Sequence, residues 1–205
     1  MNNIGSTGII TVPLLSSLLV FSAASTNIFE NSDNLSKDVE KMVNDVVEEV
    51  ATYIVIKDAI GKYYHNADGV PKVRKIVVLV KPLIPSVINI SELTIEISNG
   101  NDVMLLSYSG KAMQSNSAAL FEHQIWDKTV DAFSLIVLID KDKSLLDHGI
   151  MNEDLALIAI RLPDKFAMGD DESITLSIIP VRGAITSVVL ETLFFHSSNV
   201  VSLGC

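Results

Sequence analysis

The chain contains very little of two kinds of residue that often reveal a protein's class. Cysteine occurs once, as the last residue, Cys205. A single thiol excludes an intramolecular disulfide and a cysteine-based metal site. Basic residues are also scarce, since 15 lysines and arginines stand against 25 acidic residues, for a formal net charge of -10. Nucleic-acid partners require a surplus of positive charge, so this balance argues against nucleic-acid binding.

The first 29 residues lack charged side chains altogether. The run is long enough to cross a bilayer as a helix, for which about 20 apolar residues suffice. Small and hydroxylated residues such as Gly8, Ser16 and Ser22 interrupt it, and such residues let helix backbones approach closely. We therefore predict a helix that packs against other helices. Eight apolar residues are candidates for a polymerisation core: Ile9, Ile10, Leu14, Leu15, Leu18, Leu19, Val20 and Phe21.

A second helical pattern follows the polar stretch 30–34. Apolar residues recur at steps of three and four from Leu35 to Ile54, with charged residues between them. If the two segments join, one helix runs from about residue 4 to residue 60 and forms an N-terminal region 1–61. At about 1.5 Å per residue it would be roughly 85 Å long. A helix of that length needs partners.

The pattern changes after residues 62–72, a predicted linker with Gly69 and Pro71 as helix breakers. From residue 73 to 205, short runs rich in Val, Ile and Leu alternate with turn residues. The predicted strands are 74–80, 93–98, 103–108, 133–139, 155–162, 174–179 and 185–193. About seven short strands with this punctuation favour an all-β sandwich or barrel.

Motifs that carry enzyme chemistry are missing from the sequence. It has no phosphate-binding glycine-rich loop, no HExxH and no GxSxG. Four histidines, His65, His123, His148 and His196, are scattered without metal-ligand spacing. We therefore expect no enzyme activity and no cofactor.

One acidic stretch could hold a structural cation. Asp140, Asp142 and Asp147 are weak candidate ligands, because oxygen-bearing residues at alternate positions can begin a calcium loop. Glu153 and Asp154 follow. A calcium loop of this kind requires glycine at its sixth position, where this chain has leucine. A solvated acidic turn is the simpler interpretation, with a bound cation as the alternative.

Two sequons are candidate glycan acceptors if the chain is exported. They begin at Asn34 and Asn89, in the sequences Asn-Leu-Ser and Asn-Ile-Ser. Asn34 could instead cap the second helix, and Asn89 could be a turn residue.

Segments along the whole chain resemble one known family. They are residues 8–12 with the apolar stretch to 29, the strand segments 75–82 and 88–100, the segment 151–160, and the C-terminal pair 174–186 and 188–192. In order and spacing they are similar to the archaellins, the archaeal flagellins. The resemblance implies a type IV pilin-like helix followed by an immunoglobulin-like antiparallel β-sandwich, hence an α+β fold.

The resemblance also implies a function. Archaellins are structural subunits of the archaellum, the extracellular filament with which archaea swim. The resemblance implies that the chain polymerises with copies of itself or with paralogous archaellins. It also implies that a prepilin-type peptidase removes a leader, and that the subunit passes through the cytoplasmic membrane, where an assembly platform adds it to the filament. Pro13 and the pair Ser16-Ser17 depart from the usual aliphatic helix.

Two other functions stay open at this point. An adhesive type IV-like pilin would use the same assembly, and no residue distinguishes adhesion from swimming. A membrane-anchored β-sandwich accessory protein of the motor would carry a lipid-adapted span. The serines and alanines of the first 29 residues disfavour that alternative.

Overall fold

The computed structural model describes residues 32–65, 69–115, 120–129, 131–192 and 199–204. The eight predicted polymerisation-core residues lie outside these ranges. The chain divides into two compact units, and the boundary in the sequence lies between Asp45 and Val46. None of the helices among the described residues is both long and apolar enough to cross a membrane.

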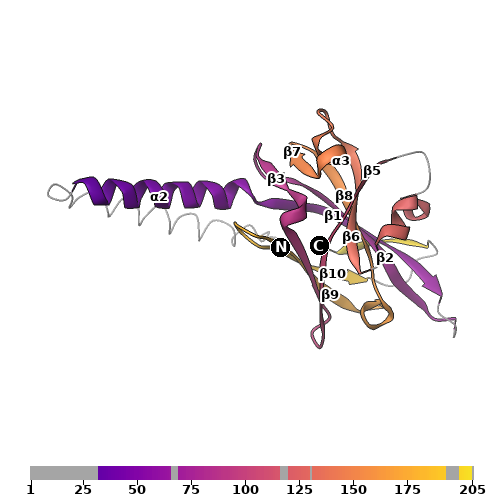
Figure 1. The fold of residues 1–205 in the computed structure, drawn as a ribbon. Helices are drawn as coiled ribbons and strands as arrows, with labels where there is room; N and C mark the ends of the chain where they lie inside the picture. The colour runs from indigo at the N-terminus through magenta and orange to yellow at the C-terminus, as the bar shows by residue number, and fades with distance from the viewer. Residues whose placement is uncertain (1–31, 66–68, 116–119, 130, 193–198, 205) are drawn as a thin grey trace, which may run out of the picture. The chain divides into compact units, whose positions relative to one another are not determined.

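Helix α2 spans Ser32–Ala51 (Figure 1). Its apolar side chains recur with a helical period and remain 38–64% exposed: Val39, Met42, Val43, Val46 and Val47. The predicted continuation to residue 60 is wrong, because strand β1 (Ile54–His65) begins three residues after the helix ends. Residues 54–60 are mostly β-branched or small, and Ile54 suits a helical and a strand period equally well.

The predicted boundary at residue 61 and the predicted linker 62–72 are therefore also wrong. β1 continues through Lys62 to His65, and β2 starts at Pro71. The two strands pair antiparallel over nearly their whole length, from Ile54 opposite Pro82 to His65 opposite Pro71. Gly61 is a strand residue at a close approach, since a Cβ there would lie 2.7 Å from Cγ1 of Val73.

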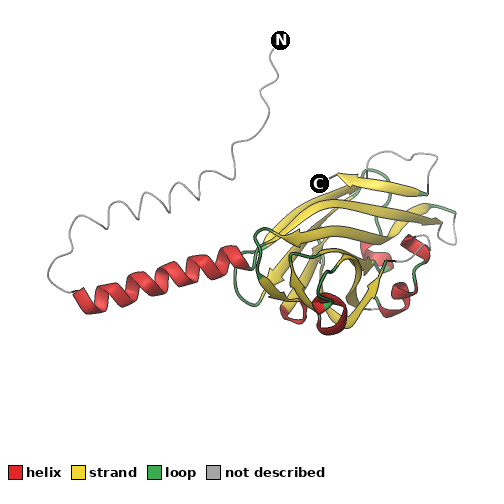
Figure 2. Ribbon diagram, turned by 90° about the horizontal axis from the view of Figure 1, so that it is seen from above, coloured by secondary structure: helices red, strands yellow, loops and turns green. Residues whose placement is uncertain are grey.

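Nine strands of the described chain form one closed sheet, in the order β1-β11-β10-β9-β4-β5-β6-β8-β2. Figure 2 shows these strands in yellow. The remaining bounds are β2 (Pro71–Pro82), β4 (Leu93–Ser98), β5 (Val103–Gln114), β6 (Ala132–Ile139), β8 (Leu155–Arg161), β9 (Ser173–Pro180), β10 (Thr186–Thr192) and β11 (Val200–Gly204). β3 (Val87–Asn89) and β7 (Ile150–Asn152) form a separate pair. Short helices lie in the connections between strands: η1 (Ile90–Glu92), η2 (Leu120–Glu122), η3 (Gln124–Lys128), α3 (Ser144–His148) and η4 (Asp164–Phe166).

The mostly β character of the chain is confirmed, and each of the seven predicted strands overlaps an observed one. The two-sheet antiparallel sandwich differs from what the topology shows. The sheet closes on itself, and β5 and β6 run parallel, with Ser107 opposite Ala132 and Gln114 opposite Val137. Parallel neighbours require a crossover connection, which residues 115–131 supply.

The interior of the closed sheet holds the main hydrophobic core. Inward-facing residues alternate with outward-facing ones along β4, where Leu93, Ile95 and Ile97 are buried. Phe133 of β6 is fully buried, and its ring lies 5.6 Å from that of Tyr108.

A second, smaller core lies on the outer side of the sheet. Val77 of β2, Ile136 of β6 and Ala159 of β8 are fully buried there, beneath η2 and η3. The covering side chains are Phe121, Ile125 and Trp126. We call this side of the sheet the covered face.

Candidate cation site, glycan acceptors and relatives

The acidic stretch predicted from the sequence lies where β6 ends. Asp140 follows the last residue of β6, and Lys143 takes a left-handed conformation (φ 62°) that turns the chain into α3. Gly149 ends α3, also left-handed at φ 69°, and its N–H donates to the carbonyl oxygens of Leu145 and Ser144. β7 then leads to Asp154, which is 2% exposed.

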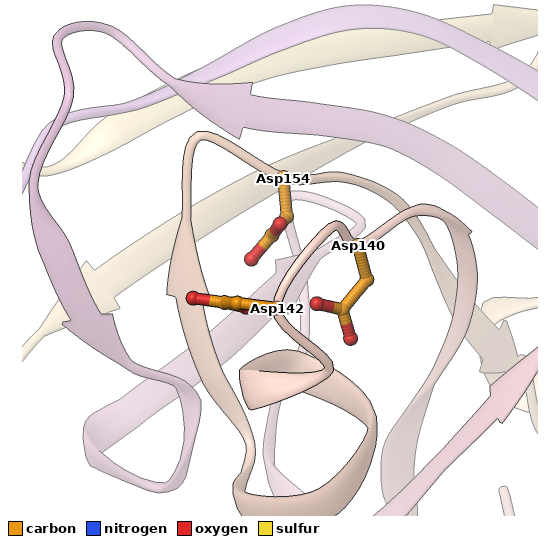
Figure 3. Close-up of side chains that lie close together, drawn as sticks. All are labelled: Asp140, Asp142 and Asp154. Atoms are coloured by element: carbon orange, nitrogen blue, oxygen red, sulfur yellow. The ribbon is translucent and has the colours of Figure 1, made fainter.

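Three carboxylates meet in this turn (Figure 3). One oxygen from each of Asp140, Asp142 and Asp154 lies within 4.8 Å of the others. Two ligands of a single Ca²⁺, each at roughly 2.4 Å, are at most about 4.8 Å apart, so the spacing suits one cation.

Backbone N–H groups hold each carboxylate in place. Asp140 Oδ2 accepts from Leu146 N at 2.9 Å, Asp142 Oδ1 from Ser144 N at 2.9 Å, and Asp154 Oδ2 from Asn152 N at 2.7 Å. Asp140 Oδ1 is buried without a hydrogen-bond partner. A buried, unpaired carboxylate oxygen is costly, and a cation would satisfy it.

The protonation of the three groups is shaped by the same turn. Burial raises the pKa of Asp154, and the nearby charges of Asp140, Asp142 and Glu153 raise it further, against a lowering by the Asn152 N–H. Hydrogen bonds from Ser144 lower the pKa of Asp142. Crowded negative charge of this kind attracts a hard cation with oxygen ligands.

Of the three carboxylates predicted from the sequence, the structure brings Asp140 and Asp142 together but not Asp147. Asp147, predicted with Asp140 and Asp142, is exposed on α3 and is not part of the group. Asp154 takes its place, brought back by the β7 turn. The sequence shows several acidic residues after Asp142, but only the fold shows which of them lies beside Asp140 and Asp142.

Asn89 is the N-cap of η1. Its Oδ1 accepts from Ser91 N at 3.1 Å and from Ser91 Oγ at 2.7 Å, while its Nδ2 donates to Glu92 Oε1 at 3.0 Å. These bonds are exposed, so the sequon lies at the surface. The backbone of Asn34 lies in α2, whose first residue is Ser32.

Comparison with known proteins gives relatives over almost the whole chain. Flagellin B3 of Methanocaldococcus jannaschii is 28% identical over 209 residues, which cover 97% of this chain and 95% of that protein. No protein-family model matches the chain.

Solved structures share the fold. The crystal structure of archaeal flagellin FlaB1 from Methanocaldococcus jannaschii matches with a TM-score of 0.63 and 17% identity, over 73% of this chain and 95% of that one. The archaeal flagellum of Methanospirillum hungatei matches with a TM-score of 0.50 and 11% identity, over 94% of this chain and 95% of that one.

The chain is thus similar to an archaeal flagellin over almost its whole length, and it shares the fold of solved archaeal flagellin structures. Both findings agree with the sequence resemblance to the archaellins, the archaeal flagellins.

Proposed function

We propose that the chain is a structural subunit of an archaellum, an extracellular helical filament used for swimming, and that it polymerises through its N-terminal segment. The observation that carries the proposal is the similarity to Flagellin B3, which extends over 97% of the chain. The similarity thus includes the N-terminal segment as well as the β-domain.

The polymerisation core in this proposal consists of the eight apolar residues between Ile9 and Phe21. The absence of charge from the first 29 residues supports it. Such a helix gains nothing by hydrophobic transfer when it leaves lipid for a bundle, so close packing of small residues must stabilise the assembly. A head-to-tail repeat that does not close produces a fibre.

Export completes the proposal. A prepilin-type peptidase removes a leader, the subunit passes through the cytoplasmic membrane, and an assembly platform adds it to the filament, alone or with paralogous archaellins.

Asn34 and Asn89 are the proposed glycan acceptors. The exposed hydrogen bonds around Asn89 support its access to a transferase. Intact-mass measurement of the native subunit tests this, and the bare polypeptide mass would contradict it.

The cation site is a further part of the proposal. Asp140, Asp142 and Asp154 would hold Ca²⁺ or a similar hard cation in a structural role. The buried, unpartnered Asp140 Oδ1 supports it.

The domain division is proposed with the corrected boundary. A fragment of residues 52–205 keeps all of β1, and we expect it to be soluble, β-rich and unable to polymerise. A fragment of residues 61–205 lacks the half of β1 that pairs with residues 77–82, and we expect it to aggregate. Circular dichroism and electron microscopy distinguish these outcomes. Filaments from the 52–205 fragment would contradict the division.

The decisive experiment changes one residue of the proposed core. Leu15→Asp places a carboxylate where it costs roughly 2.5–3.5 kcal/mol in a membrane helix, and every subunit of a packed bundle would carry the same penalty. We expect no filaments on cells, with the subunit still present by immunoblot. Glu48→Gln is the matched control and should assemble normally. Abundant filaments of normal length from Leu15→Asp would mean that another part of the chain forms the core.

A further inference from the structure

The outer side of the closed sheet has a second large surface, formed by β5, β4, β9 and β10. These strands are neighbours, and their outward residues form rows across them. In one row Ser98 pairs with Val103 on one side and Thr175 on the other, and Thr175 pairs with Val189. We call the outward residues of these four strands, every second one in 94–98, 103–107, 173–179 and 187–191, the uncovered face.

Large apolar side chains on the uncovered face are open to solvent. Val103 is 61% exposed, Leu105 62% and Val189 47%. The hairpin between β9 and β10 extends the surface with Val181 at 72% and Ile185 at 57%. Val103 and Leu105 lie on β5, and Val189 lies beyond Ser98 and Thr175 in the same row. Exposed apolar side chains interspersed with polar ones are typical of surfaces that contact another protein.

The charge of the uncovered face limits the kind of partner. Among its residues only Glu96 and Glu191 are charged, and none is basic or aromatic. A nucleic acid or an anionic membrane would require lysines and arginines. A second copy carries the same net charge of -10, so two copies repel each other except where charge is sparse.

We propose that the uncovered face is a contact surface between neighbouring copies of this chain in the filament, separate from the contacts of the N-terminal helices. The inference rests on the proposed function. The exposed hydroxyls of Ser107 and Ser187 suit this role, because they are hydrated in the free subunit and can form hydrogen bonds across an interface. Ser177 and Ser187 already bond to each other across β9 and β10, at 2.9 Å.

The test measures the accessibility of single cysteines in a Cys205→Ser background. Ser107→Cys and Ser187→Cys place thiols on the uncovered face. Ser115→Cys is the matched control, because Ser115 is also exposed and lies one residue after the same strand, β5, as Ser107, away from the uncovered face. The rate of labelling by a maleimide is compared between purified filaments and the same filaments dissociated to subunits.

We expect Ser107→Cys and Ser187→Cys to label about tenfold more slowly, or slower still, in filaments, because packed interface cores exclude solvent. Ser115→Cys should label at similar rates in both states. Equal rates in both states for the two face cysteines would overturn the inference, including the case in which residues of the same subunit protect them. If the parent chain forms no filaments at all, the proposed function fails instead, so the two failures are distinguishable.

Discussion

The covered face and the uncovered face are two outer sides of one closed sheet, and they differ in what lies over them. On the covered face, Val77, Ile136 and Ala159 are fully buried beneath side chains of η2 and η3. On the uncovered face, Val103 and Leu105 are more than 60% exposed, and serines and threonines surround them. Among the residues that the structure describes, side chains of η2 and η3 cover the first side, and the valines and Leu105 of the second side are open to solvent.

The topology explains why the cover lies where it does. β5 and β6 are parallel, so the chain must cross over between them, and that crossover contains Phe121, Ile125 and Trp126. On the uncovered face, a short turn, Asn99–Asp102, joins β4 to β5, and residues 181–185 join β9 to β10. Neither connection is long enough to fold over the face. Stability and assembly should therefore be separable by mutation.

The largest effect on stability is expected from Trp126→Ala on the covered face. Trp126 is 2% exposed, stacks on Phe121 with ring centroids 5.9 Å apart, and donates its indole N–H to Leu120 O at 3.0 Å. Truncating a buried Trp costs about 3–5 kcal/mol. Urea unfolding of dissociated subunits should show a loss of that size. A loss below about 1 kcal/mol, the size typical of an ordinary substitution, would mean that the cover is dispensable for folding.

The proposed cation site should give the next largest effect on stability, and that effect should be independent of both faces. Free Ca²⁺ at a hundred times its dissociation constant stabilises the folded state by about 2.7 kcal/mol. We expect calcium to raise the melting temperature of dissociated subunits, and Asp154→Asn to remove the gain. Asp147→Asn, outside the group, is the matched control and should keep it. An identical calcium response in all three proteins would contradict the site.

The same site predicts a pH dependence. Its main buried carboxyl, Asp154, has a raised pKa in the folded state, so in the absence of cation the folded state binds the proton more tightly than the unfolded chain does. Stability without calcium should therefore fall as pH rises from about 3.9, the ordinary Asp value, through the raised folded value. The calcium gain should appear over the same interval, because binding needs the carboxylate. A calcium gain that is constant from pH 4 to pH 7 would contradict this linkage.

The sequence pattern predicted most of the strands, but it did not predict that the sheet closes on itself. Runs such as 93–98 and 174–179 alternate clearly, and both are strands. Local spacing places residues 54–60 in the helix, because Ile54 continues the apolar spacing of α2, and only pairing with residues 77–82 makes them a strand. Long-range pairing overrides such local preference.

The candidate cation site was likewise predictable only where it depends on local spacing. Asp140 and Asp142 are near each other along the chain, so their spacing could be read. Asp154 reaches them only because the α3 turn and β7 bring the chain back, and no spacing rule encodes that return. The covering role of Trp126 was not predicted either, because the segments on both sides of it, 110–124 and 127–132, have no clear helical or strand period.

A smaller loss of stability is expected from Lys75→Met, which tests how the cover is attached. Lys75 Nζ donates to Phe121 O at 2.9 Å and lies 5.0 Å from the Trp126 ring centroid. A partly exposed cation–π contact and a hydrogen bond from a charged donor together should contribute about 1–2 kcal/mol, while the methionine keeps most of the packing. Lys72→Met, on the same strand, is the control. Equal losses for both variants would mean that Lys75 does not hold the cover.

The smallest effect on stability is expected from Leu105→Thr on the uncovered face. Leu105 is 62% exposed and pairs with Glu96 of the neighbouring strand β4. The substitution therefore leaves no cavity. Exposed strand positions favour β-branched residues, and surface changes are usually within about 0.5 kcal/mol. Unfolding of dissociated subunits should therefore match the parent chain. Filaments should nevertheless become shorter or less numerous, because the apolar contact between copies is removed. A variant that destabilises the subunit as strongly as Trp126→Ala does would show that the uncovered face serves the fold, and the separation of the two faces would be lost.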